Sequence, residues 1–121
     1  SGDNADVPQA SRKFVNDFTD AVNKCLISGE LDHNLIAAAL CVTRTQLNRK
    51  IKAITGLTTT EYISQIRISL AKKLLDNESL LIGDIAQRCG VDDVAYFSAI
   101  FKKATGYTPS GWRNRKKSLN S

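Results

Sequence analysis

The sequence LNRKIKAITGLT at residues 47–58 is matched by FSAIFKKATGYT at residues 97–108, fifty residues later. A shorter match precedes it, because LIAAALCV at 35–42 pairs with IAQRCGV at 85–91 at an offset of 49. The second copy therefore holds one extra residue in the turn between its two segments. Chance similarity would not keep the apolar positions, a lysine and a terminating glycine together, so we interpret the pattern as an internal repeat.

Each copy has the pattern of a short helix, a turn and a second helix with its own start signal. Asp32 is the expected cap of the first short helix, and Thr43 with Gln46 predicts a capping box at the start of its partner. In the second copy the expected cap is Asp92 or Asp93. The predicted inner faces of the two second helices consist of Leu47, Ile51 and Ile54 in one copy and Phe97, Ile100, Phe101 and Ala104 in the other. This is the helix-turn-helix plan, in which the second helix enters the major groove of DNA.

A long helix is expected to link the two copies. It begins at a capping box formed by Thr58 and Glu61, and it stops at residues 76–79. A helix of about 18 residues is about 27 Å long, which would set the two second helices about one duplex turn apart. Its predicted inner face consists of Tyr62 or Ile63, Ile66, Leu70 and Leu74.

The whole chain is predicted to be all-α, with seven helices forming two tandem helix-turn-helix subdomains joined by the long linker helix. Residues 1–9 are expected to form a flexible lead. Residues 10–78 would hold an N-terminal helix with an acidic polar face, the first helix-turn-helix unit and the linker. Residues 79–121 would hold the second unit and a final helix that opens at Thr108 and Pro109.

Charge is distributed in alternating blocks. The net charge is −3 over residues 1–40, +6 over 41–73, −4 over 74–93 and +6 over 94–121, which gives +5 for the chain. Solvated helix faces are the ordinary explanation of such blocks. Two basic blocks separated by an acidic one indicate instead two contacts with a polyanion.

The residues that would carry other chemistry are sparse. Cys25, Cys41 and Cys89 are odd in number and far apart, which favours reduced, buried thiols over disulfides. The single histidine, His33, has no closely spaced ligand partner, so we expect no metal site. No nucleophile motif or glycine-rich phosphate loop is present, so we expect no cofactor and no enzyme activity in this piece. Because no apolar run approaches the roughly 20 residues of a membrane span, the domain is expected in the cytoplasm, without membrane contact.

Three motifs occur between residues 32 and 113, namely I-R-I-x-x-A-x-x-L-L in the linker, then I-A-x-x-x-G-V, and then Y-F-S-x-x-F-K-K-x-x-G-Y-T-P. Together they resemble the AraC/XylS-type DNA-binding domain. The resemblance implies a bacterial, sequence-specific transcription regulator, which we expect to be an activator that binds double-stranded DNA. The preceding acidic helix is similar to that of output domains in hybrid two-component regulators. This similarity implies a longer protein, with a histidine kinase upstream and a sensor that anchors the full-length protein to the membrane. RNA polymerase and a second copy of the full-length protein stay open as further partners.

We call the second helix of each copy its recognition helix. In the first copy, polar and basic residues lie opposite the apolar face formed by Leu47, Ile51 and Ile54. Arg49 is suited to pair bidentately with guanine, Asn48 to read adenine, and Thr45 to meet a thymine methyl group or a phosphate. Arg44 and Lys52 are better placed for phosphate. The full set of DNA-contacting residues predicted in this unit is Thr43, Arg44, Thr45, Asn48, Arg49 and Lys52.

The second recognition helix offers fewer polar readers. Its predicted DNA-contacting residues are Asp93, Ala95, Tyr96, Ser98, Ala99, Lys102 and Lys103. The family resemblance leads us to expect an arginine or another polar reader where this chain has Ala99, and two alanines offer only apolar contact. We therefore expect the first unit to supply most base discrimination and the second to supply affinity.

Several alternatives stay open at this point. A helical protein-interaction adaptor is the main rival, and it predicts exposed apolar grooves without basic recognition faces. RNA binding is disfavoured because the aromatic residues fall on inner faces, where Trp112 is expected to pack as core. The basic residues that either contact phosphate or only face solvent are Lys50, Arg67, Lys72, Lys73, Arg113 and Arg115.

Overall fold

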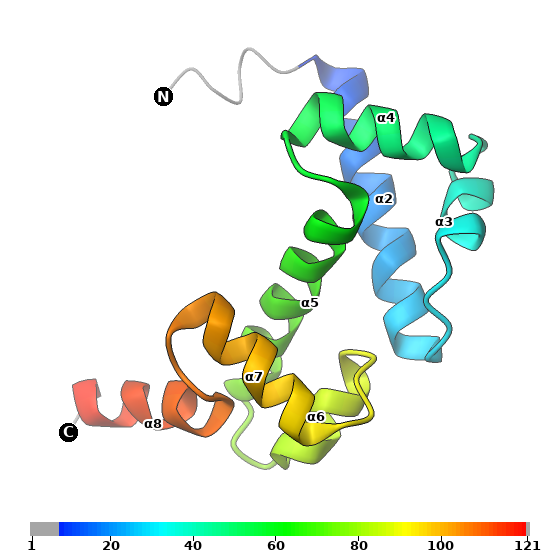
Figure 1. Ribbon diagram of the computed structural model, residues 1–121. Helices are drawn as coiled ribbons and strands as arrows, with labels where there is room; N and C mark the ends of the chain where they lie inside the picture. Colours follow the sequence, from blue (N-terminus) through cyan, green and yellow to red (C-terminus); the bar gives the residue numbers. More distant parts are fainter. Residues whose placement is uncertain (1–7, 121) are drawn as a thin grey trace. The chain divides into compact units, whose positions relative to one another are not determined.

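The computed structural model describes residues 8–120, with side chains up to Arg115. Most of the lead expected over residues 1–9 lies outside the described residues. The described chain forms seven helices and no strand, namely α2 (Gln9–Ser28), α3 (His33–Ala39), α4 (Arg44–Thr55), α5 (Thr59–Leu75), α6 (Ile82–Arg88), α7 (Val94–Thr105) and α8 (Pro109–Asn120) (Figure 1). The predicted all-α architecture is confirmed. Within this range no helix has both the length and the apolar content needed to cross a membrane.

The chain divides into two compact units, one up to Ile66 and one from Arg67 onward. The division falls inside α5, so the amino-terminal half of this helix belongs to the first unit and the carboxyl-terminal half to the second. Helices α3 and α4 form the helix-turn-helix pair of the first unit, and α6 and α7 form that of the second. The domain limits of 10–78 and 79–121 stay a prediction.

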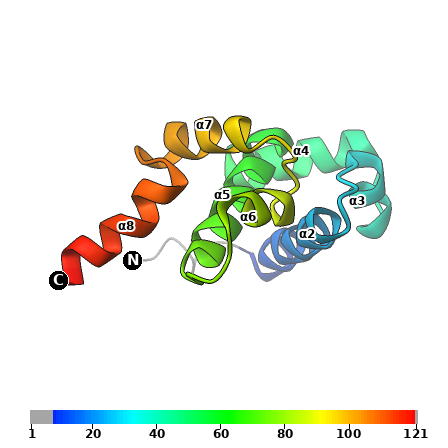
Figure 2. The same cartoon turned by 90° about the horizontal axis from the view of Figure 1, so that it is seen from below.

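The first unit is held together by contacts among three helices. Helix α2 contacts α3 and α4, and α3 contacts α4 (Figures 1 and 2). The rings of Phe18 in α2 and Tyr62 in α5 lie 5.8 Å apart between centroids, so the start of α5 also packs here. The buried apolar residues of this unit are Phe18, Val22, Leu26, Ile36, Ala37, Leu47, Ile51, Ile63 and Ile66.

The second unit has its own apolar core. Helix α7 contacts both α6 and α8. The buried cluster consists of Ile68, Ala71, Leu75, Ile85, Ala86, Cys89, Val91, Phe97 and Phe101. Trp112 in α8 packs against this cluster, with its ring edge-on to Phe101 at 5.9 Å and 84°. The prediction that Trp112 packs on the core is confirmed, although its side chain is only half-buried.

Some predicted inner-face positions are wrong or only partly right. Ala104 is exposed, because it lies in the last turn of α7, where the chain turns at Gly106 to leave the helix. In α5, Leu70 and Leu74 are only half-buried against the second core. The buried residues of this helix in the second unit are Ile68, Ala71 and Leu75. One continuous stripe was expected, but the residues that the two cores take from α5 do not follow a single line along the helix.

Candidate nucleic-acid interface

The first helix-turn-helix pair begins at the predicted caps. The Asp32 carboxylate accepts a hydrogen bond from the backbone N–H of Asn34 at 2.8 Å. The Thr43 hydroxyl accepts from the N–H of Gln46 at 3.1 Å, and the Gln46 side chain accepts from the N–H of Thr43 at 2.9 Å. Because these bonds satisfy backbone donors that a helix start leaves free, they fix the first turn of α4 and the side chains on it.

In the second pair, Asp93 is the residue that caps the recognition helix. Its carboxylate accepts from the backbone N–H groups of Ala95 and Tyr96 at 2.9 Å and 3.3 Å. The choice between Asp92 and Asp93 is therefore decided. The carboxylate of Asp93 serves the helix start, and its contact with DNA stays a prediction.

The turns of the two units differ by one residue, as the repeat predicts, since α3 is followed by four residues and α6 by five before the next helix begins. Both turns use a left-handed backbone conformation, with φ of 60° at Cys41 and 79° at the matching Gly90. Residues other than glycine rarely adopt this conformation, because their Cβ then approaches the following carbonyl oxygen.

The three cysteines are free thiols in different surroundings. The prediction that all are buried is wrong for Cys41, which is exposed because it lies in the turn, and Cys25 is half-buried. Cys89 is fully buried, and burial raises the pKa of its thiol to about 11, although the nearby Arg67 acts in the opposite direction.

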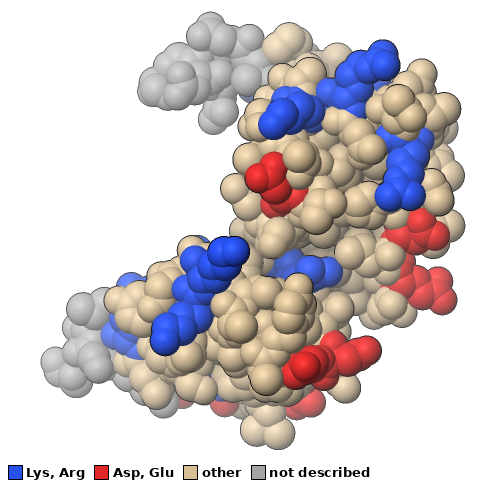
Figure 3. Space-filling model, viewed as in Figure 1, with Lys and Arg blue, Asp and Glu red and all other residues tan. Residues whose placement is uncertain are grey.

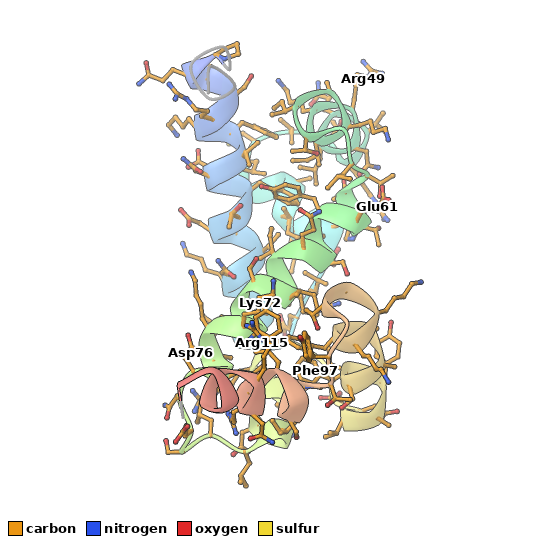
Figure 4. The ribbon with its side chains drawn as sticks, turned by 90° about the vertical axis from the view of Figure 1, so that its left-hand side faces the viewer. Arg49, Glu61, Lys72, Asp76, Phe97 and Arg115 are labelled. Carbon is orange, nitrogen blue, oxygen red and sulfur yellow. The ribbon has the colours of Figure 1, made fainter. Side chains whose placement is uncertain are left out.

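The outer face of α4 is polar and basic. Leu47 and Ile51 on the inner face have no exposed surface, whereas the predicted DNA-contacting residues of the unit are exposed. These exposed residues are Thr43, Arg44, Thr45, Asn48, Arg49 and Lys52. Figure 3 shows basic side chains over α4, and Figure 4 marks Arg49 on the outer side of this helix. A capped helix with such a face is suited to enter a groove of DNA.

The outer face of α7 is less polar. Ser98 is half-buried, and the other residues predicted to contact DNA in this unit are exposed. Those exposed residues are Asp93, Ala95, Tyr96, Ala99, Lys102 and Lys103. Basic side chains gather over α7 in Figure 3 as well. The two lysines lie in the last turn of the helix, so the turns before it expose mainly Val94, Ala95, Tyr96 and Ala99.

A hollow of about 390 Å³ lies beside α4 in the first unit. It is lined by His33, Arg44, Asn48, Lys52, Thr58, Thr59 and Thr60. Within it, the hydroxyl of Thr59 donates a hydrogen bond to Oδ1 of Asn48 at 2.8 Å. Thr59 was not among the residues predicted to form the site, although the repeat sets it opposite Pro109, at a position where the two copies differ. Cationic and hydroxyl groups dominate this lining, which suits a phosphate group.

Several basic side chains left open by the sequence have partners within the fold. Arg67 donates from Nε to the carbonyl oxygen of Cys89 at 2.9 Å. Lys50 lies over the ring of Phe14 at 5.4 Å. Lys72 and Arg115 lie over the ring of Trp112, at 5.0 Å and 4.1 Å from its centroid, and Figure 4 shows both side chains in the same region. These cation–π contacts tie the basic groups to aromatic surface.

Comparisons with known proteins agree with this geometry. Residues 36–115 match the family model described as a helix-turn-helix domain. The chain is 37% identical over 111 residues to the HTH-type transcriptional activator RhaR of Salmonella dublin, and the match covers 90% of this chain and 39% of that protein. The chain therefore spans well under half the length of this relative.

Two solved structures share the fold. One is the C-terminal domain of AraT, a response regulator from Geobacillus stearothermophilus, with a TM-score of 0.74, 30% identity and coverage of 91% of this chain and 88% of that one. The other is a transcriptional regulator of the AraC-type DNA-binding domain-containing proteins from Chromobacterium violaceum. It has a TM-score of 0.78, 25% identity and coverage of 89% of this chain and 96% of that one.

Proposed function

This chain belongs to the AraC-type helix-turn-helix family of DNA-binding transcription regulators, and from that membership we propose that its two units contact successive major-groove segments of one DNA site. In this proposal α4 reads bases through Thr45, Asn48 and Arg49, while α7 contributes mainly affinity. The regulator as a whole would act as a transcription activator.

The observation that carries the proposal is the division of α4 into two faces. Leu47 and Ile51 are fully buried, and Asn48 and Arg49 on the other side are exposed on a helix whose start is fixed by a capping box. Amide and guanidinium groups match the donor and acceptor pattern of base edges in the major groove. The same arrangement places basic Arg44 and Lys52 on the flanks, where they would contact phosphates.

The role of the longer protein is also a proposal. We infer that the chain is the output domain of a signal-responsive regulator, because one of its structural relatives is the C-terminal domain of a response regulator. An upstream histidine kinase, a membrane anchor through the sensor, contact with RNA polymerase and self-association are all parts of this proposal. They would be examined on the full-length protein by phosphotransfer assay, membrane fractionation, in vitro transcription and light scattering.

Selection of duplexes from a random pool by the purified chain, followed by footprinting of the selected sites, tests the DNA-binding proposal. We expect one enriched sequence with two protected patches about one helical turn, or about 10 base pairs, apart. Enrichment of a single protected patch would contradict the engagement of both units. A chain that enriches no sequence would favour the protein-interaction adaptor instead.

A further inference from the structure

We propose that Thr59 is a positioning residue for DNA recognition, because its buried hydroxyl fixes which end of the Asn48 amide carries the oxygen. The inference rests on the proposed function, since Asn48 must face DNA for its orientation to matter. It adds a residue of α5, which lies outside the recognition helix, to the groups that set base preference in the first unit.

The contact is formed by one buried and one exposed side chain. Thr59 keeps only 3% of its surface exposed, and its hydroxyl lies 2.8 Å from Oδ1 of Asn48. Asn48 itself is exposed on α4. The bond therefore connects the interior of the first unit to a side chain on its outer face.

The direction of this bond follows from the single proton of the hydroxyl. Among the residues whose side chains the structure describes, the Thr59 hydroxyl donates only to Asn48. If the amide were reversed, its nitrogen would face the hydroxyl and the hydroxyl proton would lose its acceptor. A buried donor without an acceptor is strongly disfavoured, so the oxygen of Asn48 stays toward Thr59.

A fixed amide orientation matters because bases distinguish its two ends. Adenine offers an acceptor at N7 and a donor at N6, so the amide must meet it with nitrogen and oxygen in one order. The oxygen of Asn48 has a second lone pair, and its nitrogen has two N–H groups, all of which stay available for DNA. An amide that is already oriented loses less conformational freedom on binding than a freely rotating one.

The second unit lacks this contact, which gives an internal comparison. At the repeat offset of fifty, Asn48 corresponds to Ser98 and Thr59 to Pro109. Pro109 is fully buried, as Thr59 is, and each is the first residue of its helix, but proline has no hydroxyl. The fold thus accepts proline at this place, and the bond is a specific feature of the unit expected to discriminate between bases.

The test measures base preference in variants of the purified chain. The duplex selected by the wild-type chain is mutated one base pair at a time, and the affinity for each duplex is measured for wild type, Asn48→Ala, Thr59→Val, Thr59→Pro and Thr59→Ser. Thr59→Pro copies the residue of the second unit, so it removes the hydroxyl in a form that the fold already accommodates. Ser64→Ala, an exposed hydroxyl loss on the same helix, is the matched control.

We expect Asn48→Ala, Thr59→Val and Thr59→Pro to lose about tenfold in preference at the same base pair and to keep their preferences elsewhere. Thr59→Ser and Ser64→Ala are expected to keep the wild-type pattern. The proposal is overturned if both hydroxyl-free variants keep the preference that Asn48→Ala loses, or if Asn48→Ala changes no preference. A wild-type chain that selects no duplex contradicts the proposed function itself, which is a different result from a loss at one base pair.

Discussion

Arg113 in α8 donates a hydrogen bond from Nε to the carbonyl oxygen of Leu75, the last residue of α5, across 3.1 Å. Its Nη2 also donates to the carbonyl oxygen of Asn77 at 3.2 Å. The last carbonyl groups of a helix have no partner within the helix, and a cation is favourable beside them. Arg113 therefore stabilises the end of α5. From the sequence it was expected either to contact phosphate or only to face solvent, and neither expectation includes this role.

Replacing Arg113 with alanine is expected to lower the free energy of unfolding by about 1–3 kcal/mol, because two hydrogen bonds from a charged donor are lost. Arg113→Lys should recover only part of this, since an ammonium group lacks the fork that reaches both carbonyl groups. Denaturant unfolding measures the change, and Ser69→Ala, at an exposed position of α5 before its last turn, is the control. A lysine variant as stable as wild type would show that the two-pronged geometry is unimportant.

Cys41→Gly is expected to stabilise the first unit. The left-handed conformation at φ 60° costs a non-glycine residue about 1–2 kcal/mol, and glycine avoids this cost. Glycine also makes the unfolded chain more flexible, which lowers the free energy of unfolding by about 0.5–1 kcal/mol. The net gain in the free energy of unfolding should be about 0.5–1 kcal/mol. Cys41→Ala removes the thiol without relieving the backbone, so an equal gain from alanine would mean that the thiol, and not φ, was responsible.

The stability of the first unit is expected to depend on the charge of Glu61. The backbone N–H of Thr58 donates to its carboxylate at 2.9 Å, and this bond, then the Thr58 side chain and the charge of Lys52, lower the pKa of Glu61 below its ordinary value of 4.5. A lowered pKa in the folded state means that the ionised carboxylate stabilises the fold above about pH 4.5 and that this contribution is lost as pH falls through the lowered value.

Glu61→Gln keeps an oxygen acceptor for the Thr58 N–H but carries no charge. The difference in unfolding free energy between wild type and this variant should therefore shrink between pH 6 and pH 2, roughly the range over which the carboxylate takes up its proton. Denaturant titrations at several pH values measure it. If the difference stays constant with pH, the ionised form of Glu61 has no special role in the capping box.

The cysteines are expected to differ strongly in reactivity toward a thiol reagent at pH 8. Cys41 is exposed and should react first, whereas Cys89 is buried with its pKa raised to about 11 and should stay protected until the second unit unfolds. Mass spectrometry of labelled peptides over time measures both rates, and a urea-unfolded sample gives the reference. Rapid labelling of Cys89 in the folded chain would contradict the buried core around it.

Arg49→Ala is expected to reduce discrimination between the selected duplex and a scrambled one by about 1–3 kcal/mol, because a bidentate contact to a base is lost. Lys102→Ala, by contrast, should weaken binding to both duplexes alike and lower the salt dependence by about one phosphate contact. Affinity measurements on both duplexes at several salt concentrations separate the two effects. Full selectivity in Arg49→Ala would refute the assignment of base reading to this residue.

Local signals allowed the helices to be predicted well. A cap such as Thr43 and a terminating glycine such as Gly56 act within one turn of the chain, so the sequence alone reveals where α4 begins and ends. The repeat added the number and order of the helices. The contacts with DNA predicted for the exposed residues stay predictions.

Long-range contacts were out of reach of the same reasoning. Arg113 donates a hydrogen bond to the carbonyl oxygen of Leu75, which lies 38 residues earlier in the chain. The periodicity of polar and apolar residues along one helix cannot predict a partner on another helix. Ala104 and Cys41 were misjudged because apolar character predicts burial only where another segment covers the residue. The bond from Thr59 to Asn48 depends on how α5 approaches α4, which no spacing within either helix encodes.

Because both units draw residues from α5, whose seventeen residues run without a break through the division at Ile66 and Arg67, neither unit can be excised by a simple cut between them. A protease or a cloning boundary placed there would sever a helix and strip each half of its continuation. Isolated halves for biophysical work must instead overlap, with the same stretch from Thr59 to Leu75 present in both. The two helix-turn-helix units are thus joined through one continuous helix that belongs to both.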